Sequence, residues 1–153
     1  MKVPWLPKET ISEYTSDLLN NYKELTGNSI TPPIPVEDII ERYLGLTLSF
    51  EDLEEKLGMR NVLGATYIQK KEISINTRLL DDKNEGRMIF TCAHEIGHWE
   101  LHREFVDEVN RSLSNNTIIC RTGTAREPIE WQADHYASCL LMPEEFVRKT
   151  FRN

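Results

Sequence analysis

Apolar residues recur at helical spacing in residues 11–25, near the start of the chain. Positions three and four apart share one side of a helix, so this pattern predicts a helix with one apolar face. Thr10 and Glu13 have the spacing of a capping box, and Gly27 is the residue type that commonly follows a helix end. We therefore predict a first helix over about residues 10–26.

The next stretches predict one more helix and several strands. A second apolar pattern at helical spacing begins at Val36 and is closed by Gly45. Residues 46–50 alternate as in a half-buried strand, and Val62–Ile68 and Glu72–Asn76 have the pattern of a hairpin. These strands predict a small antiparallel sheet.

The second half of the chain predicts two longer helices separated by a polar segment. Residues 83–102 are apolar nearly all round, which is typical of a helix at the centre of a domain. Residues 103–124 are polar, with a possible short strand at Thr117–Arg121, and we expect this segment to border a cleft. A fourth helix is predicted from Pro128 to Pro143, where a last helix starts. The fold class is therefore α+β.

Composition agrees with one compact domain. The chain has 153 residues without an internal repeat or linker, so we expect a single domain over residues 1–153. Hydrophobic residues make up 39% and charged residues 28%, as in ordinary globular proteins. The net charge of −7, without a basic patch, argues against direct binding of nucleic acid.

Cysteine usage and hydropathy bear on the cellular compartment. The chain has 3 Cys with no closely spaced pair, which favours free thiols in a reducing compartment. No signal peptide pattern or apolar stretch of about 18 residues is found. We expect a cytoplasmic protein without a membrane span, while its oligomeric state is left open.

The strongest chemical signal lies in the third predicted helix, at His94-Glu95-Ile96-Gly97-His98. This HExxH pattern places two imidazoles on one side of a helix, about 6 Å apart, where both reach one zinc ion. Glu95 lies beside the metal position and is suited to take a proton from the attacking water. A pair of ordinary buried histidines is the alternative interpretation.

A catalytic zinc site needs a third protein ligand and an open position. A pattern in which that ligand follows the second histidine by six residues is absent, because Leu101 and Glu104 occupy the required positions. His102 lies about 12 Å along the helix from His94, too far to share one ion.

A carboxylate from the fourth helix is the remaining solution, and Glu130 offers one. Asp134, one turn further on the same side, is suited to accept the free N–H of a ligating histidine and fix its orientation. A solvated pair of acidic residues is the alternative for these two positions.

These motifs resemble the ImmA/IrrE-type metallopeptidases, a bacterial and phage family of zinc-dependent zincins. The blocks that carry the resemblance are residues 90–98, FTCAHEIGH, and residues 130–143, with Glu130, Ala133, Asp134 and the ending Leu-Leu-Met-Pro. Leu63-Gly64-Ala65 and residues 73–76 resemble two strands of the family. The resemblance implies a zincin-like metallopeptidase domain with one zinc per chain, which cleaves or inactivates a helix-turn-helix repressor.

The residue that stabilises the oxyanion is not identified by the sequence. Five side chains are chemically able, although each is more simply explained as structural: His135, Tyr136, His102, Tyr67 and Arg121. Cys92 is predicted to be a buried core thiol, whereas Cys120 and Cys139 are open to a redox role with nothing nearby to activate them.

Three functions from different classes fit the sequence. A zinc endopeptidase that cuts a regulator uses every residue of the motif. A binding module that sequesters a regulator or antitoxin without turnover would have no need of Glu95. A zinc hydrolase of a small molecule is the third possibility, whereas a peptidase is expected to bind its target in extended form along an edge strand beside the cleft, near the predicted hairpin.

Overall fold

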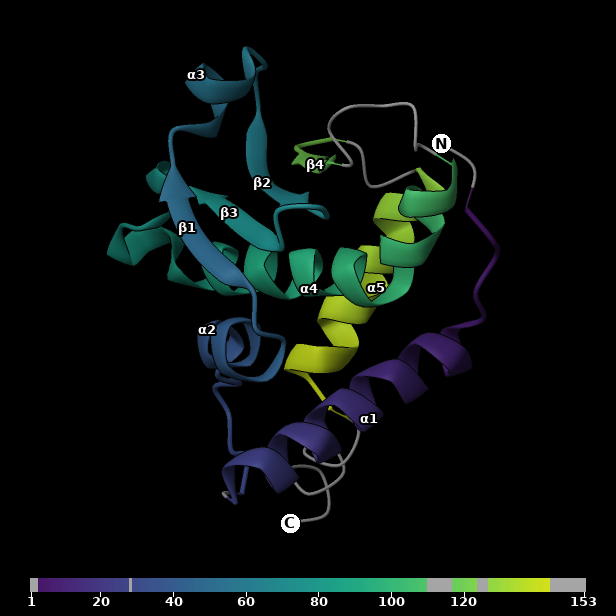
Figure 1. The fold of residues 1–153 in the computed structure, drawn as a ribbon. Helices are drawn as coiled ribbons and strands as arrows, with labels where there is room; N and C mark the ends of the chain where they lie inside the picture. The colour runs from purple at the N-terminus through teal and green to yellow at the C-terminus, as the bar shows by residue number, and fades with distance from the viewer. Residues whose placement is uncertain (1–2, 28, 110–116, 124–126, 144–153) are drawn as a thin grey trace.

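The computed structural model describes residues 3–27, 29–109, 117–123 and 127–143 (Figure 1). The last helix predicted after Pro143 lies outside these residues. A sheet covers one side of a long helix, and further helices lie on the other side of that helix. None of the helices in the described part of the chain is long and apolar enough to cross a membrane.

Within the described residues the sheet has four strands in the order β1-β3-β2-β4: β1 (Thr47–Glu51), β2 (Val62–Tyr67), β3 (Glu72–Asn76) and β4 (Thr117–Arg121). The predicted hairpin of β2 and β3 is confirmed, and β4 adds to β2 in antiparallel fashion. The prediction of an antiparallel sheet is wrong for β1, which pairs with β3 in parallel. Alternation along a strand shows which side chains face the core, but it carries no information about the partner strand or its direction.

The parallel pairing of β1 depends on a connection that the sequence pattern did not reveal. A short helix, α3 (Leu53–Leu57), follows β1. The side chain of Asp52 accepts a hydrogen bond from the backbone of Glu55, and Gly58 ends the helix in the left-handed conformation at φ 64°. Because α3 and β2 intervene, the chain returns to the starting end of β1 before β3 begins.

The long helix is α4 (Glu85–Val109), and α5 (Pro128–Leu141) crosses it on the side away from the sheet (Figure 1). Every residue of α4 from Thr91 to Trp99 is buried, which confirms the prediction of a central helix that carries the HExxH motif. The helix extends beyond its predicted end near residue 102. Pro128 occupies the first turn of α5, where its missing N–H leaves no carbonyl unsatisfied.

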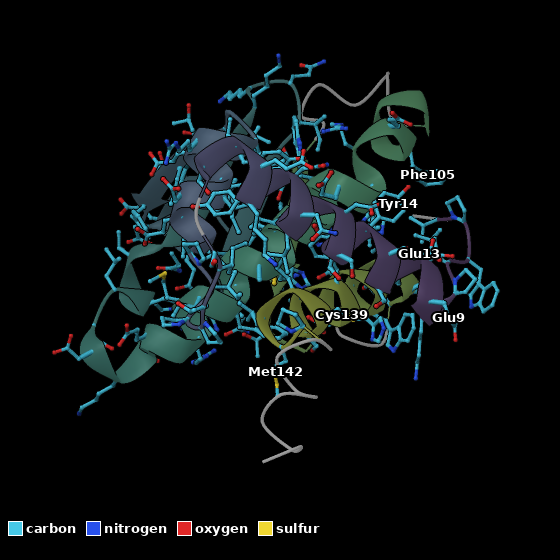
Figure 2. The ribbon with its side chains drawn as sticks, turned by 90° about the horizontal axis from the view of Figure 1, so that it is seen from below. Glu9, Glu13, Tyr14, Phe105, Cys139 and Met142 are labelled. Atoms are coloured by element: carbon cyan, nitrogen blue, oxygen red, sulfur yellow. The ribbon has the colours of Figure 1, made fainter. Side chains whose placement is uncertain are left out.

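The N-terminal helix α1 (Lys8–Thr26) lies along α5 on the outside of the molecule (Figure 2). Gly27 follows it at φ 70°, as predicted. The predicted capping box is wrong, because the helix begins two residues earlier, after Pro7, and Thr10 is inside it. The predicted second helix is a single turn, α2 (Val36–Asp38), followed by a π-helical turn, η1 (Ile39–Tyr43).

The larger of the two apolar cores formed by the described residues fills the space between the sheet and these helices. It combines buried side chains of α1, η1, β3, α4 and α5, among them Ile11, Ile40, Ile75, Ile96 and Leu140. Because α4 packs against the sheet on one side and against α5 on the other, the central turns that carry the motif are enclosed by other elements.

Candidate metal centre

The helix α4 brings His94 and His98 to the same side, one turn apart. Their ring centroids lie 4.6 Å apart at an interplanar angle of 86°, and both side chains are buried. The two Nε2 atoms converge because residues four apart on a helix point in nearly the same direction.

Glu130 approaches both imidazoles from the first turn of α5. Its Oε2 lies 2.8 Å from His94 Nε2, and its Oε1 lies 3.1 Å from His98 Nε2. One donor atom from each of His94, His98 and Glu130 falls within 4.8 Å of the other two. The structure therefore brings together the three residues that the sequence singled out as ligands.

The chemistry of this donor set fits zinc. Two nitrogens and one carboxylate oxygen are common zinc ligands, and at tetrahedral angles such donors lie roughly 3.3 Å apart. The observed separations of 2.8 and 3.1 Å differ from that value by only a few tenths of an ångström. His98 Nε2 is fully buried without a hydrogen-bond partner, so this atom is oriented toward the carboxylate but not satisfied by it.

The ionisation of Glu130 also matches a cation site. Burial alone would raise the pKa of Glu130, but its close contacts with the imidazoles of His94 and His98 outweigh this effect and lower the pKa to about 2. The carboxylate is therefore charged throughout the physiological range, as a metal ligand must be.

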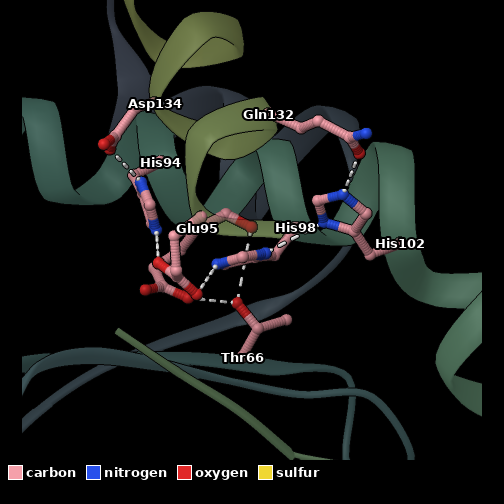
Figure 3. Close-up of polar contacts among 8 residues, drawn as sticks. Thr66, His94, Glu95, His98, His102, Gln132 and Asp134 are labelled. Atoms are coloured by element: carbon pink, nitrogen blue, oxygen red, sulfur yellow. Dashed lines mark hydrogen bonds and ion pairs between the residues drawn. The ribbon is translucent and has the colours of Figure 1, made fainter. Parts of the chain in front are cut away.

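Asp134 contacts the far side of His94, as predicted for a residue that orients a ligand (Figure 3). Its Oδ1 lies 2.7 Å from His94 Nδ1. Burial would lower the pKa of His94, but contacts with Asp134, Cys120 and Glu130 hold it well above its usual value. Since Asp134 accepts the proton on Nδ1, His94 Nε2 is the nitrogen available to a metal.

Glu95 points from the same turn of α4 toward the sheet, where it is fully buried. The Thr66 hydroxyl of β2 donates to Glu95 Oε2, while Oε1 has no hydrogen-bond partner. Burial raises the pKa of Glu95 to about 8. The ionised form of such a group is a stronger base than an exposed glutamate, and a cation held by the neighbouring donors would favour that ionised form.

Gly64 makes room for this carboxylate. A Cβ at Gly64 would lie 3.0 Å from Glu95 Oε1 and 3.0 Å from Thr91 Cγ2. Gly64 and Thr66 are two residues apart on β2, so both face α4. One face of β2 therefore supplies the space and the hydrogen bond that hold Glu95.

A cleft of about 220 Å³ opens onto His94, Glu130 and Asp134. Its opposite wall is formed by the end of β4 and the residues after it, from Cys120 to Gly123. The prediction that the polar segment before α5 borders a cleft is confirmed for these residues.

The five candidates for the oxyanion donor fall in different places. Arg121 lines the cleft, and it alone among the five does so. His102 lies behind His98, Tyr136 is fully buried, and Tyr67 belongs to the smaller core on the outer face of the sheet. His135 stacks on Trp131 at 5.5 Å.

The three cysteines differ in their burial and in their distance from the site. Cys92 is fully buried in the core, as predicted. Cys139 lies between α5 and α1, where it lines a small cavity with Leu19 (Figure 2). Cys120 was not predicted to lie at the site, yet its sulfur falls within 4.8 Å of ligand atoms of His94 and Glu95. Burial raises the pKa of the Cys120 thiol.

Thr66, Cys120 and Gln132 are the site neighbours that sequence reasoning missed. Alternation along residues 62–68 would have placed Thr66 on the same face as Gly64, which is the signal for Thr66 in the sequence. The contacts of Cys120 and Gln132 arise from the packing of β4 and α5 against α4, which no local pattern encodes.

A family model described as the IrrE N-terminal-like domain, a peptidase family, matches residues 41–153. The chain belongs to this family. The resemblance inferred from the two motif blocks is thus confirmed, and an IrrE-like peptidase domain accounts for the mixed helix and sheet fold. No curated protein matches the chain. The IrrE-like match includes all three converging donors, whereas α1 precedes it.

Proposed function

We propose that this IrrE-like peptidase is a zinc-dependent endopeptidase that cleaves a helix-turn-helix repressor or a similar regulatory protein. The observation that carries the proposal is the buried Glu95 carboxyl, with one unpartnered oxygen, next to three converging zinc-type donors. Burying a carboxyl group without a full set of hydrogen-bond partners costs stability. Groups buried in this way are concentrated at functional sites.

His94, His98 and Glu130 would hold the zinc, and Asp134 would keep His94 in the required tautomer. Zinc supplies Lewis acidity, which polarises the scissile carbonyl and lowers the pKa of water in the cleft. Glu95 accepts the proton of the attacking water and delivers it to the nitrogen of the leaving amine. The oxygen of that water bonds to the carbonyl carbon, the C–N bond breaks, and the proton leaves with the amine, so water is the only co-reactant.

The choice of a regulatory protein as substrate is supported by the family resemblance and by charge. A net charge of −7 favours association with a basic partner, such as the DNA-binding surface of a repressor. The cytoplasm, where such repressors act, agrees with three free cysteines.

A binding module without turnover is the alternative. Such a module would use the metal for stability alone. The fully buried Glu95 would then reduce the stability of the fold without serving a function. The environment of Glu95 therefore favours the peptidase.

Comparison of wild-type protein with Glu95→Gln tests the proposal. Glutamine keeps the size and shape of Glu95 but cannot accept the proton, so zinc should stay bound while hydrolysis falls by at least ~100-fold. Mass spectrometry of a proteome treated with each protein identifies the peptides that depend on Glu95. Identical cleavage patterns, or unchanged turnover of an identified target, would remove Glu95 from the mechanism.

A further inference from the structure

A row of hydrogen bonds extends from His98 through His102 to Gln132 (Figure 3), and a further bond connects Gln132 to the N-terminal segment. His98 Nδ1 lies 3.0 Å from His102 Nδ1, and His102 Nε2 lies 2.8 Å from Gln132 Oε1. The amide nitrogen of Gln132 then donates to the backbone carbonyl of Pro4 at 2.8 Å. His98, His102 and Gln132 are each at most 2% exposed, so water does not compete for the contacts among these three side chains, whereas the contact with the exposed Pro4 is partly buried.

The carbonyl of Pro4 gives this row a direction. A carbonyl oxygen only accepts, so the Gln132 atom facing Pro4 must be the amide nitrogen, and the oxygen must face His102. His102 Nε2 must then carry the proton that this oxygen accepts. In neutral His102 the other nitrogen, Nδ1, is therefore an acceptor, and His98 Nδ1 must carry the proton between the two rings.

The opposite direction fails at the Pro4 end. If His98 carried its proton on Nε2, His102 would have to donate from Nδ1, and its Nε2 would be a lone pair. Gln132 would then need to turn its nitrogen toward His102, which would leave two oxygens facing each other at 2.8 Å at Pro4.

A doubly protonated His102 would also satisfy Gln132, but it would bury a positive charge behind a metal ligand. The side chain is 1% exposed, and no carboxylate contacts either of its nitrogens among the described residues. Such an unpaired buried charge is costly. The neutral form of His102 is therefore the one compatible with the contacts.

We propose that His102 and Gln132 are positioning residues that hold His98 in the Nδ1–H tautomer, so that its Nε2 lone pair is directed at Glu130 and the metal. This inference rests on the proposed zinc site. In that tautomer the Nε2 lone pair of His98 and the carboxylate oxygen Oε1 of Glu130, 3.1 Å apart, are two acceptors that face each other. A cation between them is the group that satisfies both.

The two ligand histidines are thus oriented by different means. His94 donates to a carboxylate, Asp134, whereas His98 donates to a neutral row that ends on the backbone of Pro4. Pro4 precedes the residues that match the family, so a part of the chain outside that match would tune the metal site.

The first test reads the tautomers directly in the metal-free protein. Long-range proton–nitrogen NMR spectra should show the proton of His98 on Nδ1 and that of His102 on Nε2. In His102→Phe, which keeps an aromatic ring but removes the acceptor, the proton of His98 should move to Nε2 and bond to Glu130. A proton on Nε2 of His98 in the wild-type protein overturns the proposal.

The second test measures zinc affinity by competition with a chelator. His102→Phe should weaken binding by about 10- to 100-fold, the usual effect of removing a partner of a ligand. In His102→Asn an amide oxygen takes the place of Nδ1 and should restore most of the affinity. Gln132→Met, similar in shape but without the amide, should fall between His102→Phe and the wild type.

The control is His135→Phe, which removes a histidine of α5 that stacks on Trp131 away from the cleft. This variant should bind zinc as the wild type does. Equal affinity in His102→Phe and His135→Phe contradicts the proposal, and so does a failure of His102→Asn to restore binding while its thermal unfolding is normal. If the wild type binds no zinc, the proposed function fails, whereas the NMR result still decides the tautomers.

Discussion

At the scale of single residues, the carboxylates of Glu130 and Asp134 in α5 contact opposite nitrogens of the His94 imidazole and therefore have different roles. Glu130 faces His94 Nε2, where a metal would bind, and Asp134 faces Nδ1. We expect Glu130→Ala to lose nearly all of its zinc, because this substitution removes a ligand. Asp134→Ala should weaken zinc binding by about 10- to 100-fold, because His94 loses the partner that orients it. Elemental analysis after dialysis measures both. Glu127→Ala, an exposed residue at the start of α5, controls for the loss of charge.

Full zinc retention in Glu130→Ala would show that the third ligand lies elsewhere. If Asp134→Ala and Glu127→Ala lost equal amounts of bound zinc, Asp134 would act only through the net charge of the protein and not through His94.

Gly64 offers a residue-scale test of how closely Glu95 is held. The added methyl of Gly64→Ala would meet Glu95 Oε1 and Thr91 Cγ2 at 3.0 Å, so the carboxylate must shift by a few tenths of an ångström. Misplacement of a catalytic group is costly, and we expect cleavage to fall on the order of 10-fold. Zinc content should be unchanged, since no ligand is contacted. Lost zinc with unchanged cleavage per bound ion would contradict this account.

The residues of the site differ in how well the sequence predicted them. His94, Glu95 and His98 follow from a fixed spacing on one helix, and Asp134 follows from its place one turn after Glu130. Gln132 lies between these two positions and was not predicted, because its role depends on His102 and on Pro4, 128 positions away. Spacing reveals groups that act from one element, whereas partners from distant elements require the packed structure.

At the scale of elements, α5 packs tightly against α4 at Gly97. A Cβ there would lie 3.0 Å from Tyr136 Cβ and 3.2 Å from the ring, and Tyr136 is fully buried. Gly86 lies on the same helix with nothing within 4 Å of its Cβ position. The two glycines therefore separate helix propensity from packing.

We expect Gly86→Ala to stabilise the protein by up to ~1 kcal/mol, the propensity difference between alanine and glycine. Gly97→Ala gains the same propensity but overpacks the contact with Tyr136, which costs about 1–3 kcal/mol. Urea unfolding of the metal-free proteins should thus rank Gly97→Ala below Gly86→Ala by that amount. Equal stability of the two variants would show that α5 shifts to accommodate the added methyl group without a loss in the free energy of unfolding. Glu130 moves with α5, so Gly97→Ala should also weaken zinc binding.

Element prediction succeeded where local chemistry decides and failed where long-range pairing does. The start of α5 at Pro128 and the hairpin of β2 and β3 were predicted correctly. The rise in polarity after residue 102 marks where α4 leaves the core, but helix-forming residues such as Arg103 and Glu104 continue it to Val109. The direction of β1 is set by its pairing with β3, which strand alternation does not encode.

At the scale of the whole molecule, the sheet edge beside the site decides how a substrate can bind. The hairpin was predicted to lie along the cleft, but β2 is paired on both sides by β3 and β4. In the sheet formed by the described residues, β1 and β4 are the edge strands, and Cys120 and Arg121 at the end of β4 line the cleft. An extended peptide that pairs with the edge of β4 would therefore lead into the site.

Backbone pairing along β4 would give affinity with little preference for sequence, so selectivity for one regulator must come from contacts outside the cleft. The cleft of about 220 Å³ is too small to hold more than a few side chains, which also favours recognition of the folded partner. We expect one dominant cut in a folded helix-turn-helix regulator, at a rate at least ~10-fold above that of its isolated cleavage peptide, because remote contacts contribute to transition-state binding. Parallel assays by mass spectrometry measure both rates, with Glu95→Gln as the blank. Equal rates on regulator and peptide, or efficient turnover of a small amide, would rule out docking of the whole partner.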